Sequence, residues 1–269
     1  LFTIMKLTAI IVTFNRPDAL EVILQSISNQ KTLPDEVIIA DDGSSPETLN
    51  VITKIKDNFP ISIKHVWHEN NGFRAASIRN KAIKESSGEC LVFSDGDLIF
   101  HPYFFYDLKN HIKSGTALIG SRVFFKENST QKILETKQIP RITSFFSKHI
   151  EQNRLNSIRF PRLGRLISRS GFSRNLRGGL LCVWKKDILL VNGWNEDFTG
   201  WGMEDTELVA RLYHTGLTLK KLKLAGITYH LWHPLLNRKR VKKNEILLYE
   251  CIEKKTIWIK NGLVKTEKP

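Results

Sequence analysis

Apolar and polar positions alternate with two different periods along the N-terminal third of the chain. Four short runs rich in β-branched residues predict buried strands, and stretches with apolar residues three and four positions apart predict helices. The predicted strands cover Lys6–Phe14, Glu36–Ala40, Ile61–Trp67 and Cys90–Phe93, and the helices between them cover Asp18–Asn29, Pro46–Ile55 and Ala75–Glu85. Strands that alternate with helices are typical of a doubly wound, mostly parallel sheet, so we predict an α/β fold.

The length and the longest apolar runs limit the class of protein. The 269 residues suffice for one large α/β domain with a sizeable core. No stretch approaches the roughly 18 uninterrupted apolar residues that a membrane span needs. The start of the chain lacks the basic region, apolar run and small-residue site of a secretory leader, so we expect a cytoplasmic protein.

The net charge of +14 is concentrated in two stretches. Residues 126–177 contain 12 Lys and Arg against 3 Asp and Glu, and residues 234–269 contain 10 against 4. The positive charge is therefore a property of one internal segment and of the C-terminal tail. It suits a solvated surface, a nucleic acid, an anionic membrane or a polyanionic acceptor, and the composition leaves these alternatives open.

The same two stretches set the predicted domain organisation. Residues 126–177 show no strong strand signal, and we predict that they form a basic, mobile insertion in a single domain of residues 5–235. In the tail, residues 236–269, apolar residues recur among lysines at about helical spacing. This pattern predicts an amphipathic helix that lies on a membrane interface or on the protein's own core.

Two pairs of acidic residues follow predicted strands. Ligands of doubly wound sheets bind beyond the carboxyl ends of the strands, where these pairs lie. Asp41 and Asp42 either cap the next helix or hydrogen-bond to a base or ribose. Asp95 and Asp97 either form an ordinary turn or hold Mg2+ or Mn2+ against a diphosphate. Neither GxGxxG nor a P-loop is present, so a bound nucleotide is held in another way.

The C-terminal half contains a second group of candidate residues. Glu204 and Asp205 begin a predicted helix, and the helix dipole alone explains acidic residues there. The preceding Trp201 and Gly202 favour a tight loop with a flat stacking face beside a carboxylate, which suits a sugar. Farther on, His230 and His233 form an HxxH pair, which Asp97 would complete as a mixed nitrogen and oxygen metal site.

Taken in order, five segments resemble the successive signatures of family 2, GT-A-fold, nucleotide-sugar-dependent inverting glycosyltransferases. They are VTFNR (residues 12–16), ADDGSS (40–45), NNGFRAASIRNKAI (70–83), SDGD (94–97) and NGWNEDFTGWGMEDTELVARLYHTG (192–216). The last segment is similar to the C-terminal half of β1,4-galactosyltransferases and of bacterial chondroitin polymerase-type domains. The resemblance implies a GT-A catalytic domain, a Rossmann-like arrangement for nucleotide-diphospho-sugars.

The resemblance also implies roles for individual residues. Asp205 is expected to be the catalytic base, with Glu204, Trp201 and Gly202 shaping the acceptor site. Asp97 is expected to bind the metal with His233 as its distant partner, and His230 is a further candidate ligand. The donor pocket is expected to contain Thr13, Arg16, Asp41, Asp42, Arg74, Arg79 and Asp95.

The expected reaction needs a base and a cation on opposite sides of the sugar. In an inverting transfer the acceptor hydroxyl attacks the anomeric carbon from the face opposite the departing diphosphate. We expect a UDP-sugar donor of the Gal, GalNAc or GlcNAc type, a glycan or lipid-linked acceptor in surface polysaccharide synthesis, and Mn2+ or Mg2+ as cofactor. An anionic membrane surface is a further expected contact, on the inner face of the cell membrane, and no nucleic acid is expected.

Two other functions compete with this interpretation. A basic nucleic-acid-binding protein would explain the charge but not the acidic pairs at the strand ends. A sugar-binding module without catalysis would keep the fold, but the intact Asp97, Asp205 and His233 argue against it.

Overall fold

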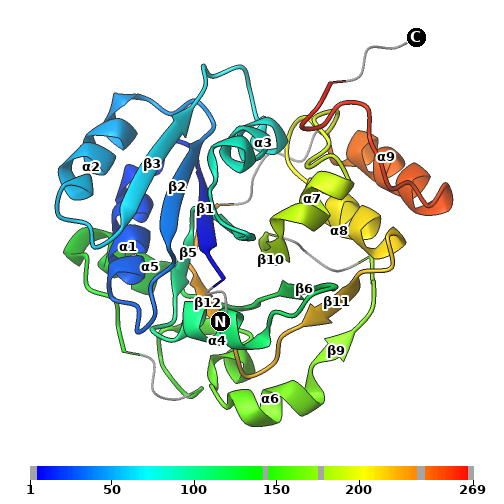
Figure 1. The fold of residues 1–269 in the computed structure, drawn as a ribbon. Helices are drawn as coiled ribbons and strands as arrows, with labels where there is room; N and C mark the ends of the chain where they lie inside the picture. Colours follow the sequence, from blue (N-terminus) through cyan, green and yellow to red (C-terminus); the bar gives the residue numbers. More distant parts are fainter. Residues whose placement is uncertain (1–4, 142–144, 175–178, 235–239, 266–269) are drawn as a thin grey trace.

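The computed structural model describes residues 5–141, 145–174, 179–234 and 240–265, and an eight-stranded sheet forms its centre (Figure 1). Its order is β3 (Ser62–Trp67), β2 (Glu36–Asp41), β1 (Leu7–Thr13), β4 (Cys90–Asp95), β10 (Leu180–Trp184), β6 (Thr116–Ile119), β11 (Thr218–Lys221) and β9 (Arg169–Ser170). The first four strands are parallel, β10 is antiparallel to both its neighbours, and β11 is parallel to β6. The predicted α/β fold and its four strands are confirmed.

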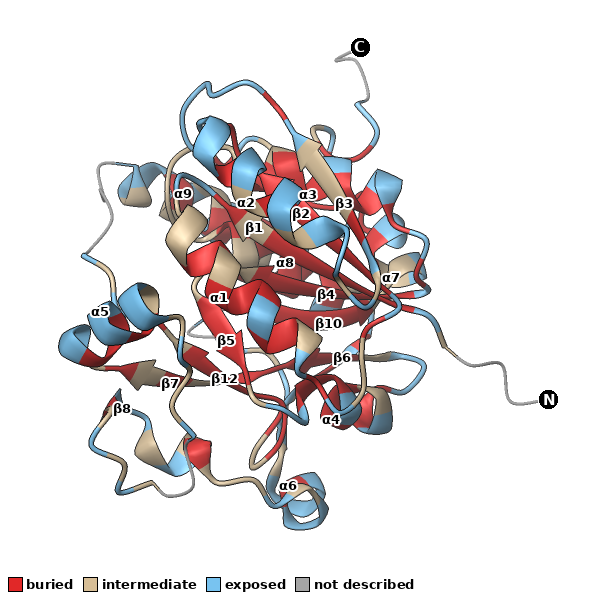
Figure 2. Cartoon of the chain, turned by 90° about the vertical axis from the view of Figure 1, so that its left-hand side faces the viewer, coloured by how far each residue is buried: buried red, intermediate tan, exposed pale blue. Residues whose placement is uncertain are grey.

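Helices cover both faces of this sheet. The first face packs against α1 (Pro17–Ser28), α2 (Pro46–Lys56), α4 (Phe104–His111) and α5 (Glu127–Thr136). The second packs against α3 (Ala75–Glu85), α7 (Lys185–Leu190) and α8 (Glu204–His214). Because side chains alternate along a strand, Ile11 points into the first core and Ile10 into the second, and both are fully buried. Figure 2 shows the strands enclosed by these helices.

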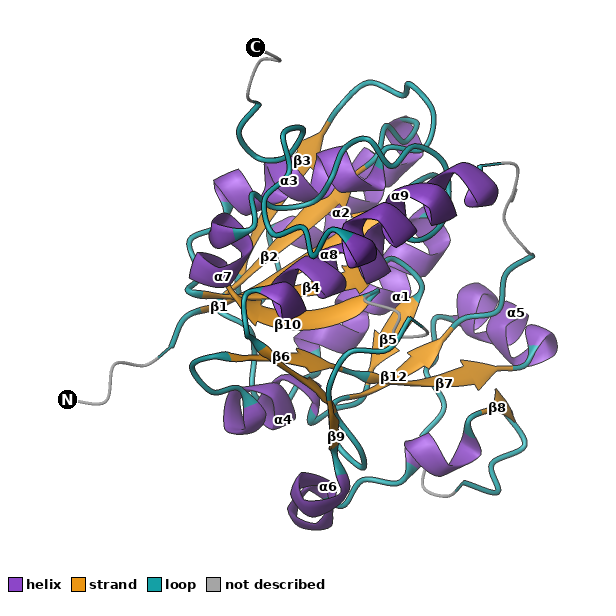
Figure 3. Cartoon of the chain, turned by 90° about the vertical axis from the view of Figure 1, so that its right-hand side faces the viewer, coloured by secondary structure: helices purple, strands orange, loops and turns teal. Residues whose placement is uncertain are grey.

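A smaller sheet lies beside the first and contains β5 (Leu98–Phe100), β12 (Ile227–His230), β7 (Ser121–Phe125) and β8 (Ile150–Gln152), in that order (Figure 3). β12 is parallel to β7 and antiparallel to β5. Because β4 leads directly into β5, the acidic turn between them lies next to the end of β12. Two segments far apart in the chain therefore meet there.

The described part of the basic segment 126–177 contains α5, β8, the 3-10 helix η1 (Arg154–Ser157), α6 (Pro161–Ile167) and β9. β8 pairs with β7 and β9 with β11, so the segment contributes to both sheets, although its sequence shows no strong strand signal. Strands of three and two residues are too short to produce a periodic pattern. Arg159 forms an ion pair with the buried Asp107 at 2.6 Å. The mobility of this segment stays a prediction.

The C-terminal tail contains α9 (Val241–Glu253), which packs against α8. Its buried residues are Asn244, Leu248 and Cys251, so this face of the helix lies on the protein's own core. After α9, the Asn192 side chain donates to the carbonyls of Ile259 and Val264 at 2.7 and 2.9 Å. Among the described residues, no helix has the length and hydrophobicity that crossing a bilayer requires.

Candidate active site

Three side chains predicted to be metal ligands converge at the edge of the smaller sheet. Asp97 precedes β5, whose Leu98 lies opposite His230 of β12. The Nε2 atoms of His230 and His233 lie 3.4 and 3.2 Å from the same Oδ2 atom of Asp97. One ligand atom from each of the three residues lies within 4.8 Å of the other two. The structure therefore brings together one carboxylate and two imidazoles.

The polar atoms of this cluster suit a divalent cation. Asp97 Oδ1 is buried and has no hydrogen-bond partner among the described residues. His233 Nδ1 donates to the Pro234 carbonyl at 2.7 Å, so the contact between Nε2 and the carboxylate needs either a second proton on the ring or a cation between them. Burial tends to raise the pKa of Asp97, but the His233 hydrogen bond and the charges of His230, His233 and Arg122 outweigh it and lower the pKa. The carboxyl is therefore ionised, as a metal ligand must be.

A buried arginine joins the DGD turn to the start of α8. Arg79, on α3, is 4% exposed and lies over the Trp194 ring at 4.3 Å. Its Nη2 atom lies 3.1 Å from Asp95 Oδ1, and its Nη1 atom lies 3.3 Å from Glu204 Oε1. The predicted donor residue Arg79 thus connects a carboxylate predicted for the donor side with one predicted for the acceptor side.

Glu204 and Asp205 begin α8 next to this network. Burial and the charge of Asp205 raise the pKa of Glu204 to about 7, against the opposing effect of Arg79. Asp205 Oδ1 accepts hydrogen bonds from the backbone N–H and the hydroxyl of Thr206 at 2.7 and 3.2 Å. Burial also raises the pKa of Asp95, and the charge of Asp205 adds to that effect. Several carboxyl groups therefore influence one another across one small volume.

The sequence did not single out Arg122, a second arginine beside these carboxyl groups. Its Nη1 atom, on β7, lies 3.9 Å from Asp95 Oδ2, and its charge lowers the pKa of Asp97. A Cβ atom at Gly179 would lie 2.5 Å from Arg122 Nη2 and would also clash with the Asp95 carboxylate, so a side chain there would displace both groups. The available signal was an arginine directly before the apolar run Val123–Phe125.

Asp41 closes the turn after β2. Its Oδ1 accepts from the Ser44 N–H at 2.8 Å, and its Oδ2 lies 3.0 Å from His65 Nε2. These contacts outweigh the effect of burial and lower the pKa of Asp41. The N–H group that Asp41 binds belongs to Ser44, which lies before Ser45 and the start of α2. Asp41 therefore stabilises the turn and not the helix start itself.

Asp42 connects the same turn to the start of α3. Its Oδ1 lies 2.7 Å from His68 Nε2, and its Oδ2 accepts from the Arg74 N–H at 2.8 Å. Burial raises the pKa of Asp42, and these two contacts offset only part of that effect. The Arg74 guanidinium donates to the Glu69 carbonyl, so it also stabilises the loop before α3. The structure brings the backbone of Arg74 to Asp42, and a role of these two residues in donor binding stays a prediction.

Thr13 and Arg16 lie at and just beyond the end of β1, between this turn and the metal-ligand cluster. Thr13 lies opposite Asp41 in the β1–β2 ladder, and its hydroxyl is buried without a hydrogen-bond partner among the described residues. The Asp97 hydrogen bond raises the pKa of His233, and the charge of Arg16 opposes this rise, so Arg16 lies near the cluster.

The loop before α8 has backbone angles that favour glycine. Gly200 and Gly202 have φ values of 76° and 109°, and Met203 has 73°. Asn244, fully buried on α9, donates to the carbonyls of Gly202 and Thr199 at 2.9 and 3.4 Å. The tail helix therefore supports the loop that leads into Glu204 and Asp205.

The side chains before Asn244 complete this support. A Cβ atom at Gly200 would lie 2.9 Å from the Cβ atom of Arg240, and one at Gly202 would lie 3.6 Å from Val241. Trp201, predicted for the acceptor site, lies between these two glycines and is partly exposed. The sequence did not indicate that the tail contacts this loop.

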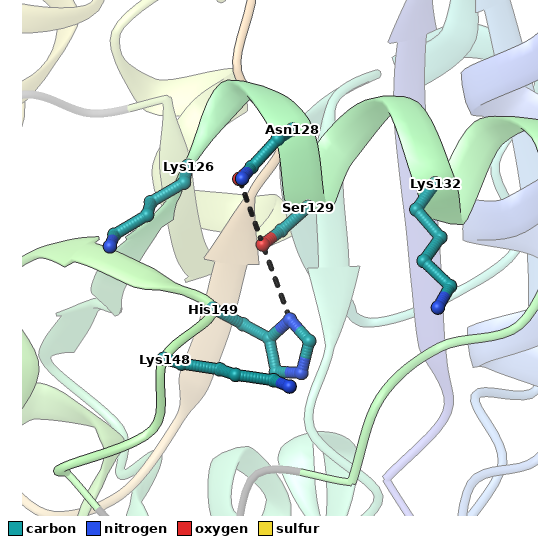
Figure 4. A pocket seen from close by; sticks show the side chains of 6 residues that line it. All are labelled: Lys126, Asn128, Ser129, Lys132, Lys148 and His149. Atoms are coloured by element: carbon teal, nitrogen blue, oxygen red, sulfur yellow. Dashed lines mark hydrogen bonds between the residues drawn. The ribbon is translucent and has the colours of Figure 1, made fainter.

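A separate hollow of about 350 Å3 lies near the start of α5 and contains none of the predicted site residues (Figure 4). It is lined by Lys126, Asn128, Ser129, Lys132, Lys148 and His149. The Ser129 hydroxyl contacts His149 Nδ1 at 3.2 Å. The hollow is basic but does not include the carboxyl groups of the candidate active site.

Comparison with known proteins identifies the family. The model described as glycosyl transferase family 2 matches residues 8–176. The chain belongs to glycosyltransferase family 2. A second model, described as the N-terminal domain of galactosyltransferase, matches residues 166–234, which include the WGMED and HxxH segments. The predicted family and the enzyme class are confirmed.

Relatives of this glycosyltransferase are polysaccharide synthases and transferases. Chondroitin synthase from Escherichia coli is 28% identical over 83% of this chain and 34% of its own length. Hyaluronan synthase from Pasteurella multocida is 26% identical over 80% of this chain and 24% of its own length. A GalNAc(5)-diNAcBac-PP-undecaprenol beta-1,3-glucosyltransferase from Campylobacter jejuni is 26% identical over 72% of this chain and 56% of its own length. The chain spans only about a quarter to a half of these relatives.

Solved structures of glycosyltransferases share the fold. GalNAc-T7 with UDP, GalNAc and Mn2+ superposes with a TM-score of 0.67 at 14% identity, over 93% of this chain and 48% of its own. The mannosyltransferase PcManGT from Pyrobaculum calidifontis, with GDP-Man and Mn2+, superposes with a TM-score of 0.59 at 15% identity, over 86% of this chain and 58% of its own. These structures confirm the GT-A fold.

Proposed function

We propose that this glycosyltransferase moves a sugar of the Gal, GalNAc or GlcNAc type, with inversion, from a UDP-sugar to a hydroxyl group of a glycan or lipid-linked acceptor. The observation that carries the proposal is the Arg79 guanidinium, which contacts Asp95 at 3.1 Å and Glu204 at 3.3 Å. Asp95 lies two residues before Asp97, whose cluster would bind the departing diphosphate through a cation. Glu204 is adjacent to Asp205, which would accept the proton of the attacking hydroxyl. The network therefore links a cationic site to a basic one, as an inverting transfer requires.

The donor pocket in this proposal lies around the ends of β1 and β2. Buried polar groups are normally hydrogen-bonded, so the hydroxyl of Thr13, which has no partner among the described residues, supports a ligand at this place. Asp42 and Arg74 fix the neighbouring loop, and Arg16 adds a positive charge. The match to the galactosyltransferase model and the UDP in one structural neighbour favour a uridine nucleotide.

Asp97, His230 and His233 would hold the divalent cation, and a cation there would stabilise negative charge on the departing diphosphate. The two imidazole ligands favour Mn2+ over Mg2+, because Mg2+ prefers oxygen ligands. Both structural neighbours named above contain Mn2+. Arg122 adds a fixed positive charge beside Asp95 on the same side.

Asp205 acts as the general base in this proposal and takes the proton of the acceptor hydroxyl as the new bond forms. Its carboxylate lies in the first turn of α8, where the helix dipole favours a negative charge, and the Thr206 N–H orients it. Glu204, with a pKa of about 7, is partly protonated near neutrality and can both donate and accept hydrogen bonds to sugar hydroxyls. Trp201 and Gly202 complete the acceptor side.

A lipid-linked acceptor is supported by the relative whose name includes undecaprenol, and a polysaccharide acceptor by the chondroitin and hyaluronan synthases. We therefore place the enzyme in surface polysaccharide synthesis on the inner face of the cell membrane.

A panel of UDP- and GDP-sugars tests the donor and the metal together. We expect hydrolysis of one UDP-sugar in the presence of Mn2+, loss of this activity with a chelator, and weaker rescue by Mg2+. Hydrolysis of a GDP-sugar alone would overturn the UDP assignment, and activity that persists with a chelator would overturn the metal assignment.

A further inference from the structure

Helix α6 exposes its apolar face to solvent. Phe160, Leu163, Leu166 and Ile167 are 56%, 41%, 83% and 47% exposed. They recur three and four positions apart, so they lie on one side of the helix and of the residue that precedes it. Soluble monomers rarely expose such a group of large apolar side chains unless it binds a partner.

The side of α6 that carries Gly164, next to Phe160 and Ile167, is attached to the rest of the protein. Gly164 is buried, and a Cβ atom there would clash with the Lys223 carbonyl. The Phe160 N–H donates to the Leu224 carbonyl at 2.9 Å. Gly164 therefore faces the protein while the two leucines face outward. The contacts of Gly164 and Phe160 fix the orientation of the helix, so Leu163 and Leu166 stay exposed.

Positive charge surrounds this apolar face. Arg162, Arg165 and Arg169 are exposed, and neither α6 nor the residues up to β9 include an Asp or Glu. Within the described chain, Arg162 and Arg169 have no ion-pair partner. Burial and the charges of Lys221 and Arg169 lower the pKa of Lys223, which agrees with uncompensated positive charge here.

More apolar side chains are exposed at the same end of the molecule. Phe146 is 78% exposed and Leu155 is 68% exposed. They belong to the segments on either side of β8, which lies with α6 at the lower end in Figure 2, whereas α3 and α9 lie at the upper end. The α6 surface, defined as Phe160, Leu163, Leu166 and Ile167 with the three arginines, is thus separate from the tail helix.

We propose that the α6 surface docks the enzyme on an anionic lipid bilayer. The apolar side chains enter the boundary between headgroups and acyl chains, and the arginines contact lipid phosphates. A nucleic acid would match the arginines but would leave the leucines in water. The surface extends the proposed function by placing the enzyme where a lipid-linked acceptor is found, and it can fail without the transfer reaction failing.

Sedimentation with vesicles tests the apolar part of the surface. We expect the protein to bind vesicles of phosphatidylcholine with phosphatidylglycerol, and to bind pure phosphatidylcholine vesicles weakly. Leu163→Ser with Leu166→Ser should lower the partition coefficient about tenfold or more. The matched control is Leu189→Ser with Leu190→Ser on α7, where the two leucines are 49% and 56% exposed, and it should bind as the wild type does.

A second pair of variants tests the charge. Arg162→Gln with Arg169→Gln should weaken binding to the anionic vesicles and make the remaining binding less sensitive to salt. Lys242→Gln with Lys243→Gln on α9 should change neither the binding nor its salt dependence. Equal recovery on neutral and anionic vesicles, or equal losses in test and control variants, would overturn the proposal. A concentration-dependent dimer that the leucine variant abolishes would assign the surface to a second copy instead and would also overturn it. Donor hydrolysis, unchanged in all variants, keeps this result separate from the proposed function.

Discussion

At the residue scale, the acidic pair after β2 and the candidate ligand residues differ in the hydrogen bonds of their polar atoms. Asp41 and Asp42 use both carboxylate oxygens within the protein, so in the proposed donor pocket they act through the loops that they stabilise. By contrast, Thr13 Oγ1, Asp97 Oδ1 and His230 Nδ1 are buried without partners among the described residues. Such atoms are costly to bury unless a ligand or water satisfies them.

Asp97→Ala tests the metal site. We expect the affinity for UDP in the presence of Mn2+ to fall by about 10- to 100-fold, because the variant loses the carboxylate between the two imidazoles. Calorimetry with and without Mn2+ measures this change, and Asp57→Ala, at an exposed position after α2, is the control. An unchanged Mn2+-dependent affinity for UDP would reject Asp97 as a ligand.

Glu204→Gln tests the raised pKa. The folded-state pKa of about 7 lies above the ordinary 4.5, so this carboxyl favours folding at pH values below 4.5 and loses that contribution as the pH rises through 7. The amide does not titrate, so the variant should gain stability relative to the wild type between pH 5 and pH 8, on the order of 2–3 kcal/mol. Thermal unfolding at several pH values measures the difference, and a difference that is constant with pH would contradict the prediction.

Single residues were predictable from the sequence where a motif carried them. SDGD, WGMED and HxxH led to Asp97, Asp205 and His233, and the structure brings Asp97 and His233 together. Arg122 belongs to no motif, and its place beside Asp95 depends on the pairing of β7 with β12, which no local pattern reveals.

At the scale of elements, α9 supports the candidate active site. Its Asn244 contacts the loop before α8, and the chain after it is fixed by Asn192. Deleting the tail would therefore disturb the proposed acceptor side directly, so a loss of activity in such a truncation would say nothing about membrane binding.

Asn244→Ala tests this support. The variant loses two hydrogen bonds to the loop, and we expect a stability loss of about 1–3 kcal/mol and a higher KM for the acceptor with a nearly unchanged KM for the donor. Tyr249→Ala, an exposed position on the same helix, is the control. Equal changes in both KM values, or none, would contradict a role in positioning the acceptor loop.

Elements with a clear period were predicted well, and short ones were not. β1 to β4 are six or seven residues long, and the helices between them have regular apolar spacing. β8 and β9 form only because β7 and β11 offer free edges to them, which depends on tertiary structure and not on their own sequence.

At the scale of the whole molecule, the meeting of the two sheets creates the candidate site. The larger sheet supplies Asp95 at the end of β4, and the smaller sheet supplies His230 at the end of β12. The general architecture was predictable because parallel strands place their carboxyl ends together. The second sheet was not, because its strands come from four distant parts of the chain.

The transfer assay of Asp205→Asn tests the central claim most directly. If Asp205 is the general base, transfer to a verified acceptor should fall about 100- to 10,000-fold, or roughly 3–5 kcal/mol of barrier, with donor binding nearly unchanged. A role limited to stabilising the start of α8 would cost only about 0.3–1 kcal/mol of stability and leave turnover near normal. Asp197→Asn, an exposed position shortly before α8, is the control and should retain full activity. If Asp205→Asn keeps more than about a tenth of wild-type transfer, the proposed mechanism is wrong.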